Sequence, residues 1–215
     1  MTARTERGGL QSHEVNFYVG KRGSGKSTRA KEKLGACLAA GQRVIVFDPH
    51  NEYSQRGHAS EEVVLGPLPS VREFWELRAD PTELMEGTAS FAVVPGSLKK
   101  ADVAAAFCWL AEHVYEAGDL VFGTDECVLY WESHNAQEAF NFLATQGRHP
   151  RVPMVIAAQR VVHLPYTART QVTLLDTGKQ DDPEDVAALA KRCGRDFAEK
   201  VPRLKRRERL VWTDE

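Results

Sequence analysis

Short apolar runs alternate with segments of helical spacing along most of the chain. The apolar runs have the length of buried strands, and turn residues flank them. They are residues 15–19, 44–47, 91–94, 120–122, 154–158, 172–175 and 210–212. Helical spacing is found in residues 27–40, 97–118, 136–144 and 182–194. Strands that alternate with helices predict an α/β domain with a mostly parallel central sheet and helices on both faces.

Helix-capping residues mark several of the predicted boundaries. Ser97 is a candidate N-cap, and Asp182 is another, followed by Pro183 at the first helical position. Residues 48–90 are looser and predict an irregular insertion with short helices. Residues 1–14 are polar and predict a mobile N-terminal arm, so that residues 15–215 form a single domain. The sequence contains no apolar run long enough to cross a membrane.

The strongest chemical signal lies directly after the first predicted strand, in residues 20–28. This segment, called the P-loop below, fits the pattern GxxxxGK[ST] at every fixed position. Glycines let such a loop turn its backbone N–H groups toward phosphates, and the following helix adds the partial positive charge of its N-terminus. The predicted nucleotide-binding residues are Gly20, Lys21, Arg22, Gly23, Ser24, Gly25, Lys26, Ser27 and Thr28. Lys26 is expected to reach the β and γ phosphates, and Ser27 to bind Mg²⁺.

An acidic pair follows the strand at residues 120–122 and has the form of a Walker B segment. Asp125 is expected to hold Mg²⁺, and Glu126 to polarise the attacking water as general base. The alternative interpretation is a solvated acidic pair at the end of a strand. Asp119 is at the wrong end of the same strand for this role. Ligands of open α/β sheets bind at the carboxyl ends of the strands, which is where the pair lies.

Gln159 ends the next predicted strand, residues 154–158. If that strand lies beside the P-loop strand, the Gln159 amide is close to the γ-phosphate and can orient water. A glutamine at the end of a strand is weak evidence alone. Its order after the P-loop and the acidic pair strengthens the prediction.

Three further strings complete a resemblance to the HerA/FtsK superfamily of P-loop ATPases. Residues 47–53, FDPHNEY, resemble the "DPHGEY" segment of HerA-type ATPases, with Asn51 in place of the glycine. Residues 146–149 resemble the "GRH" string, and residues 182–189 resemble "NPEDxxAL". The matches extend over about residues 15–190. The chain is little more than the motor core, which is similar to the compact genome-packaging ATPases of membrane-containing icosahedral viruses.

The resemblance implies a RecA-like fold of the additional-strand type, with ATP and Mg²⁺ as cofactors. It implies a motor that moves double-stranded DNA of any sequence, assembled as a homo-oligomeric ring, usually a hexamer, at a capsid vertex or with membrane-associated viral proteins. The expected location is the host cytoplasm and the packaging vertex of the virion. Such a ring needs an arginine finger in trans. Arg148 matches the arginine of "GRH", while Arg160 and Arg169 are rivals.

A basic tract is the main candidate for contact with DNA. Its members are Lys191, Arg192, Arg195, Lys200, Arg203, Lys205, Arg206, Arg207 and Arg209, and the pair Lys99–Lys100 is a weaker candidate. The alternative is a solvated basic face, which is the commoner meaning of such a run. The formal net charge of −2 does not by itself mark a nucleic-acid binder.

Two other functions remain open at this stage. The first is an NTP-dependent switch or assembly ATPase in DNA transfer or secretion, which would hydrolyse slowly. The second is a small-molecule kinase, a class that shares the P-loop and the size of this chain. Such kinases usually lack an acidic pair followed by a strand that ends in glutamine, and they carry an arginine-rich lid.

Overall fold

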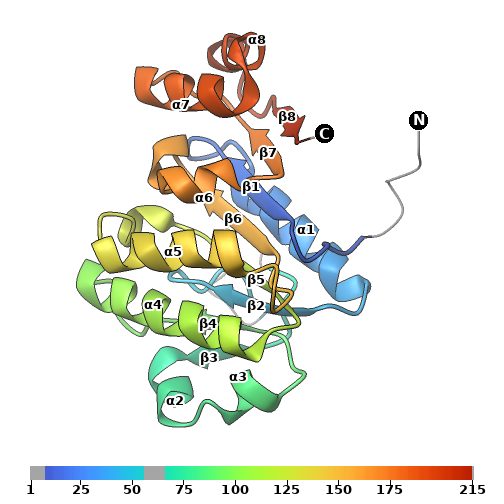
Figure 1. The fold of residues 1–215 in the computed structure, drawn as a ribbon, viewed down its shortest axis with the longest axis vertical. Coiled ribbons are helices and arrows are strands. Elements are labelled where there is room, and N and C mark those ends of the chain that lie inside the picture. The colour runs from blue at the N-terminus through green and yellow to red at the C-terminus, as the bar shows by residue number, and fades with distance from the viewer. Residues whose placement is uncertain (1–7, 56–65, 215) are drawn as a thin grey trace.

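The computed structural model describes residues 8–55 and 66–214, and these residues form one central sheet with helices on both faces (Figure 1). The strand order is β3-β4-β2-β5-β6-β1-β7-β8. The strands are β1 Val15–Val19, β2 Arg43–Phe47, β3 Val71–Glu73, β4 Phe91–Val94, β5 Leu120–Thr124, β6 Met154–Ala158, β7 Leu174–Thr177 and β8 Leu210–Thr213. All pairings are parallel except that of β7 with β8.

The strand order brings the predicted site residues together. The P-loop follows β1, the acidic pair follows β5, and β6 lies between these two strands. A strand inserted between the P-loop strand and the Walker B strand is the additional-strand arrangement. The predicted fold class is therefore confirmed.

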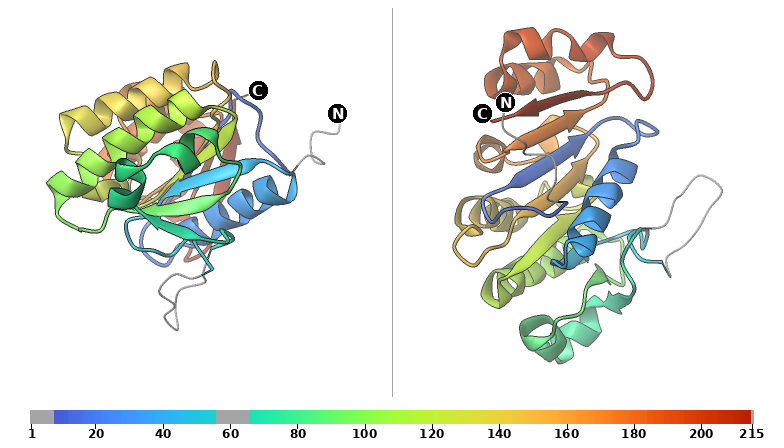
Figure 2. Two further views of the ribbon diagram at one scale, coloured as in Figure 1. Left: turned by 90° about the horizontal axis from the view of Figure 1, so that it is seen from below. Right: turned by 90° about the vertical axis from the view of Figure 1, so that its right-hand side faces the viewer.

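The helices cover the sheet in two layers. The helices are α1 Lys26–Ala39, α2 Phe74–Ala79, α3 Thr82–Glu86, α4 Lys100–Ala117, α5 His134–Gln146, α6 Tyr166–Thr170, α7 Pro183–Cys193 and α8 Arg195–Ala198, with short 3-10 turns at Cys127–Leu129, Val161–His163 and Val201–Arg203. Helices α4 and α5 pack on one face of the sheet and α1 on the other (Figure 2).

Alternate residues of the strands face the two layers, as the period of a strand requires. Phe17 and Ile45 belong to the core under α4 and α5, which also holds Phe107. Tyr18 and Val46 belong to the smaller core under α1. Burial on both faces explains why the strands read as continuous apolar runs rather than as alternating ones.

Two predicted boundaries were wrong, and one strand was missed. Ser97 is not the N-cap of α4, because the helix begins at Lys100, and the Ser97 hydroxyl instead bonds the Asp102 carboxylate at 2.8 Å. The predicted strand 172–175 is shifted to Leu174–Thr177, because the charged Asp176 is buried inside it. The insertion contains the predicted short helices, α2 and α3, but also an edge strand, β3, that the sequence analysis missed.

Parts of the N-terminal arm and of the insertion, residues 1–7 and 56–65, lie outside the described residues. The described end of the arm is tied to the domain. The backbone N–H of Leu10 donates to the Gln42 side chain at 2.7 Å, and the Gln42 amide donates back to the Leu10 carbonyl at 2.8 Å. Leu10 itself is buried.

Candidate nucleotide-binding site

The P-loop lies at the carboxyl edge of the sheet, between the end of β1 and the start of α1. Gly23 and Gly25 have φ of 76° and 84°, a region that residues with a side chain rarely adopt. A Cβ atom on Gly20 would lie 2.4 Å from the Ser24 hydroxyl, so the loop closes tightly on itself. These backbone requirements explain the glycines, and the resulting loop at a helix N-terminus is suited to bind phosphate.

Three predicted residues meet here: Lys26 at the start of α1, Glu126 shortly after β5, and Gln159 directly after β6. The Lys26 ammonium lies 3.6 Å from Oε1 of Glu126 and 3.4 Å from the Ser27 hydroxyl. The Gln159 amide donates to Oε2 of Glu126 at 3.1 Å. Lys26 is buried, and Glu126 is one-fifth exposed. The Glu126 carboxylate is thus held between an ammonium and an amide, with an opening to solvent.

The expected Mg²⁺ ligands, Ser27 and Asp125, also lie together. Oδ1 of Asp125 accepts the backbone N–H of Glu126 at 2.7 Å, and Oδ2 accepts the hydroxyl of Tyr53 at 2.7 Å. The Ser27 side chain lies near enough to the same Tyr53 hydroxyl to lower its pKa slightly, against the larger effect of burial. A hydroxyl and a carboxylate are hard oxygen donors, which Mg²⁺ prefers, so this donor set fits the ion.

Tyr53 and Asp48 are part of the site, although the sequence analysis gave them no role. Oδ2 of Asp48 accepts the backbone N–H of Tyr53 at 2.7 Å, which fixes the turn after β2. Both side chains are buried, and burial raises the pKa of Asp48 and that of Tyr53. The available signal was the FDPHNEY string itself, because it begins at the last residue of a strand on the side of the P-loop.

The three candidate arginine fingers occupy different places. Arg148 is exposed in the turn after α5, at the edge of the sheet opposite the P-loop, and its side chain makes no hydrogen bond or ion pair with the described residues. Arg160 forms ion pairs with carboxylates at the start of α7: its Nε lies 2.8 Å from Asp185, and one Nη lies 2.8 Å from Asp182. Arg169 is half-buried, and burial lowers the pKa of its guanidinium. Among the described residues of one subunit, none of the three arginines forms a hydrogen bond or an ion pair with Glu126.

The basic tract is not one continuous solvated surface. Arg192 stacks over the Trp212 ring and pairs with Asp214 at 2.7 Å, and Arg209 pairs with the buried Asp176 at 3.2 Å. Arg209 is half-exposed despite this pair, and the other exposed members are Lys191, Arg195, Lys200, Arg203, Lys205, Arg206 and Arg207. Two of the nine cations therefore hold the C-terminal strand in place, and the others face solvent.

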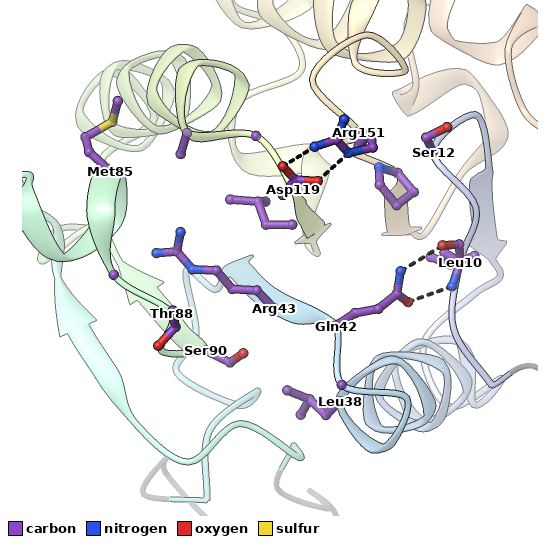
Figure 3. A pocket seen from close by; sticks show the side chains of 16 residues that line it. Leu10, Ser12, Leu38, Gln42, Arg43, Met85, Thr88, Ser90, Asp119 and Arg151 are labelled. Atoms are coloured by element: carbon purple, nitrogen blue, oxygen red, sulfur yellow. Dashed lines mark hydrogen bonds and ion pairs between the residues drawn. The ribbon is translucent and has the colours of Figure 1, made fainter.

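A cavity of about 860 Å³ lies at the opposite edge of the sheet (Figure 3). Gln42 and Arg43 border it at the start of β2, and Asp119 borders it before β5, where it pairs with Arg151. The Arg43 guanidinium is held by the carbonyls of Glu83 and Ala89, at 2.9 and 3.1 Å. The cavity is therefore separate from the nucleotide site, and Asp119 lies where the sequence analysis placed it, away from the P-loop.

The fold and this constellation define a P-loop ATPase. Residues 19–101 match the family model described as "Helicase HerA, central domain". The resemblance to the HerA/FtsK superfamily is thereby confirmed. Among the helices that the structure describes, none combines the length and the apolar character that a bilayer-spanning helix requires.

Solved structures of packaging and conjugation proteins share the fold over nearly the whole chain. The genome packaging NTPase B204 from Sulfolobus turreted icosahedral virus 2, in complex with AMPPCP, is similar with a TM-score of 0.64 and 18% identity, over 94% of this chain and 93% of that chain. B204, the DNA-packaging ATPase from Sulfolobus turreted icosahedral virus, is similar with a TM-score of 0.63 and 21% identity, over 94% of this chain and 92% of that chain. The bacterial conjugative coupling protein TrwBdeltaN70 has a TM-score of 0.61 and 10% identity, over 95% of this chain and 82% of that chain. No curated protein sequence matches the chain.

Proposed function

We propose that this protein is an ATP-driven motor that translocates double-stranded DNA and packages a viral genome into a preformed capsid. The similar structures support this proposal, because a genome packaging NTPase and a conjugative coupling protein share the fold. The HerA central-domain match supports it independently of those structures. Packaging, rather than conjugation, is favoured because the match covers 94% of this chain and 93% of B204, but only 82% of the conjugative coupling protein.

The observation that carries the hydrolytic part of the proposal is the position of Glu126 between Lys26 and Gln159. A carboxylate beside a P-loop lysine can accept a proton from the attacking water. Gln159 donates to the same carboxylate and orients it, and it directly follows β6, the strand that pairs with the P-loop strand.

The predicted metal ligands complete the proposed chemistry. Ser27 and Asp125 would hold Mg²⁺, which neutralises charge on the phosphate oxygens when it is bound. Lys26 adds a positive charge on the same side, and the backbone N–H groups of the P-loop bind the oxygens. Water attacks the γ-phosphorus, its proton passes to Glu126, and the bond to the β-phosphate oxygen breaks, so that ADP and phosphate are released.

An arginine finger from a neighbouring subunit would stabilise the transition state in the proposed hexameric ring. Arg148 remains the favoured residue, because its exposed side chain is free to meet a second copy. Arg160 is a weaker choice, since three carboxylates of the α7 region already bind it. Arg169 is weaker as well, because its guanidinium is half-buried within its own subunit.

Contact with DNA would use the exposed lysines and arginines of the C-terminal tract. Such contacts go to phosphates and are independent of base sequence, which suits a motor that slides over any sequence. The protein would act in the host cytoplasm and at the packaging vertex, together with capsid or membrane-associated viral proteins.

The deciding experiment is steady-state ATP hydrolysis with and without two unrelated duplex DNAs, at low salt and at several protein concentrations. Lys26→Ala is the control for contaminating ATPases. A motor is expected to show stimulation by both duplexes that rises with protein concentration. Slow turnover that is indifferent to DNA would favour a switch, and transfer of phosphate to a nucleoside would favour a kinase. Either result would overturn the motor proposal.

A further inference from the structure

The turn before β8 lies beside the P-loop because β8 runs against the other strands. Leu210, the first residue of β8, pairs with Thr177, the last residue of β7. An antiparallel strand starts at the edge where its neighbour ends. Residues 205–209, called the C-terminal turn below, therefore lie at the carboxyl edge of the sheet, where the nucleotide site also lies.

Two ion pairs that share the buried Asp176 connect this turn to the P-loop. Arg209 lies with an Nη 3.2 Å from Oδ2 of Asp176, and Nε of Arg29 lies 3.1 Å from the same oxygen. Arg29 then donates to the carbonyl of Ser24, inside the P-loop, at 2.9 Å. Asp176 and Arg29 are 3% and 9% exposed, so their pair is part of the packed interior, while the Arg209 side chain is half-exposed. The Glu208 carboxylate closes the turn by accepting the backbone N–H of Lys205 at 2.7 Å.

Arg206 is the residue of this turn that reaches the P-loop. A Cβ atom built on Gly23 would lie 3.7 Å from Nη2 of Arg206, and that nitrogen is the one atom within 4 Å of this position among the described residues. Arg206 is exposed, and within residues 8–55 and 66–214 its side chain makes no hydrogen bond or ion pair. A guanidinium with free donors beside a phosphate-binding loop can bind phosphate oxygens in a bidentate manner.

We propose that Arg206 contacts the phosphate chain of the nucleotide held by the P-loop of its own subunit. Arg209 is a positioning residue, which anchors the turn through Asp176. The C-terminal strand is then part of the nucleotide site, and its basic turn responds to the length of the phosphate chain. This inference rests on the nucleotide site alone and is independent of DNA translocation.

The test is calorimetric titration of the full chain with Mg²⁺–AMPPCP and with AMP. Arg206→Ala is expected to weaken AMPPCP binding by about 10-fold, the scale of one charge-assisted hydrogen bond at an exposed site. AMP binding is expected to stay within about 2-fold, because AMP lacks the β and γ phosphates, and Arg206→Lys should recover part of the loss. Arg203→Ala is the matched control, since it removes an exposed arginine of the same tract and should change neither affinity.

Two further variants separate the possible failures. Lys26→Ala should abolish AMPPCP binding; if it does not, the nucleotide site itself is misassigned. If Lys26→Ala acts as expected while Arg206→Ala leaves AMPPCP binding unchanged, this inference is wrong and the ATPase assignment stands. Arg209→Ala should weaken AMPPCP binding in the same direction as Arg206→Ala, and an equal loss of AMP and AMPPCP binding would point to a general disturbance of the P-loop instead.

Discussion

Replacing Tyr53 by Phe removes one buried hydroxyl beside the predicted Mg²⁺ ligands. That hydroxyl donates to Oδ2 of Asp125 at 2.7 Å. The ring remains, and with it the packing in the core under α1. The variant therefore tests the hydrogen bond rather than the fold.

The magnitude follows from the type of bond that is lost. A hydrogen bond to a charged group contributes about 1.5–3 kcal/mol, so we expect Tyr53→Phe to destabilise the protein by about 2 kcal/mol. For a chain of this size that corresponds to a fall in Tm of about 4–8 °C. Residues that orient metal ligands typically change metal affinity by about 10–100-fold, and we expect about 10-fold weaker binding here. The physical reason is that, among the described residues, the backbone N–H of Glu126 is then the one remaining hydrogen-bond donor to the Asp125 carboxylate.

The assay is Mn²⁺ binding followed by electron paramagnetic resonance in the presence of saturating AMPPCP, with Tm from thermal unfolding. Tyr130→Phe is the control, because the Tyr130 hydroxyl is equally buried but bonds the Thr124 hydroxyl and, at 3.5 Å, the backbone carbonyl of Asp125, and neither of these contacts orients the Asp125 carboxylate. It should lower Tm without changing Mn²⁺ affinity. If Tyr53→Phe lowers Tm while Mn²⁺ affinity is unchanged, Tyr53 only supports the core and the reasoning is refuted.

Three other variants test the remaining contacts. Glu126→Gln should bind AMPPCP like the native protein while turnover falls at least ~100-fold, the usual contribution of a general base; brisk hydrolysis in a steady-state assay would remove Glu126 from that role. Gln159→Ala should lower kcat about 10-fold, equivalent to about 1.4 kcal/mol, and an unchanged kcat would contradict the orienting contact. Asp185→Ala should lower Tm by about 4–8 °C, since it leaves the partly exposed Arg160 without its buried partner at a cost of about 2 kcal/mol; calorimetry showing an unchanged Tm would disprove this estimate.

The features that could be predicted from the sequence are those whose physical cause is local. Gly23 and Gly25 are required where the backbone takes positive φ, and the helix that starts at Lys26 follows within the same few residues. The fold class followed from the alternation of apolar runs and helical spacing. Asp125 and Gln159 could be placed near the P-loop because strands of a parallel sheet end at the same edge.

Other features depend on residues that are distant in the sequence, and only the tertiary structure decided them. Tyr53 and Asp125 are separated by 72 positions, and no periodicity links them. The predicted strand 172–175 stopped before Asp176, because a carboxylate is normally exposed. Asp176 is buried inside β7 because Arg29 and Arg209, from distant parts of the chain, pair with it.

The direction of β8 is the clearest example of a feature that only the tertiary structure decided. Residues 210–212 read as a strand, but the sequence does not say whether that strand runs with or against β7. The antiparallel pairing of Leu210 with Thr177 decides that the basic turn lies beside the P-loop and not at the opposite edge. Local pattern determines which elements form, because propensity and burial act over a few residues. The packing of the whole sheet determines which ends meet, because that depends on pairings between distant segments.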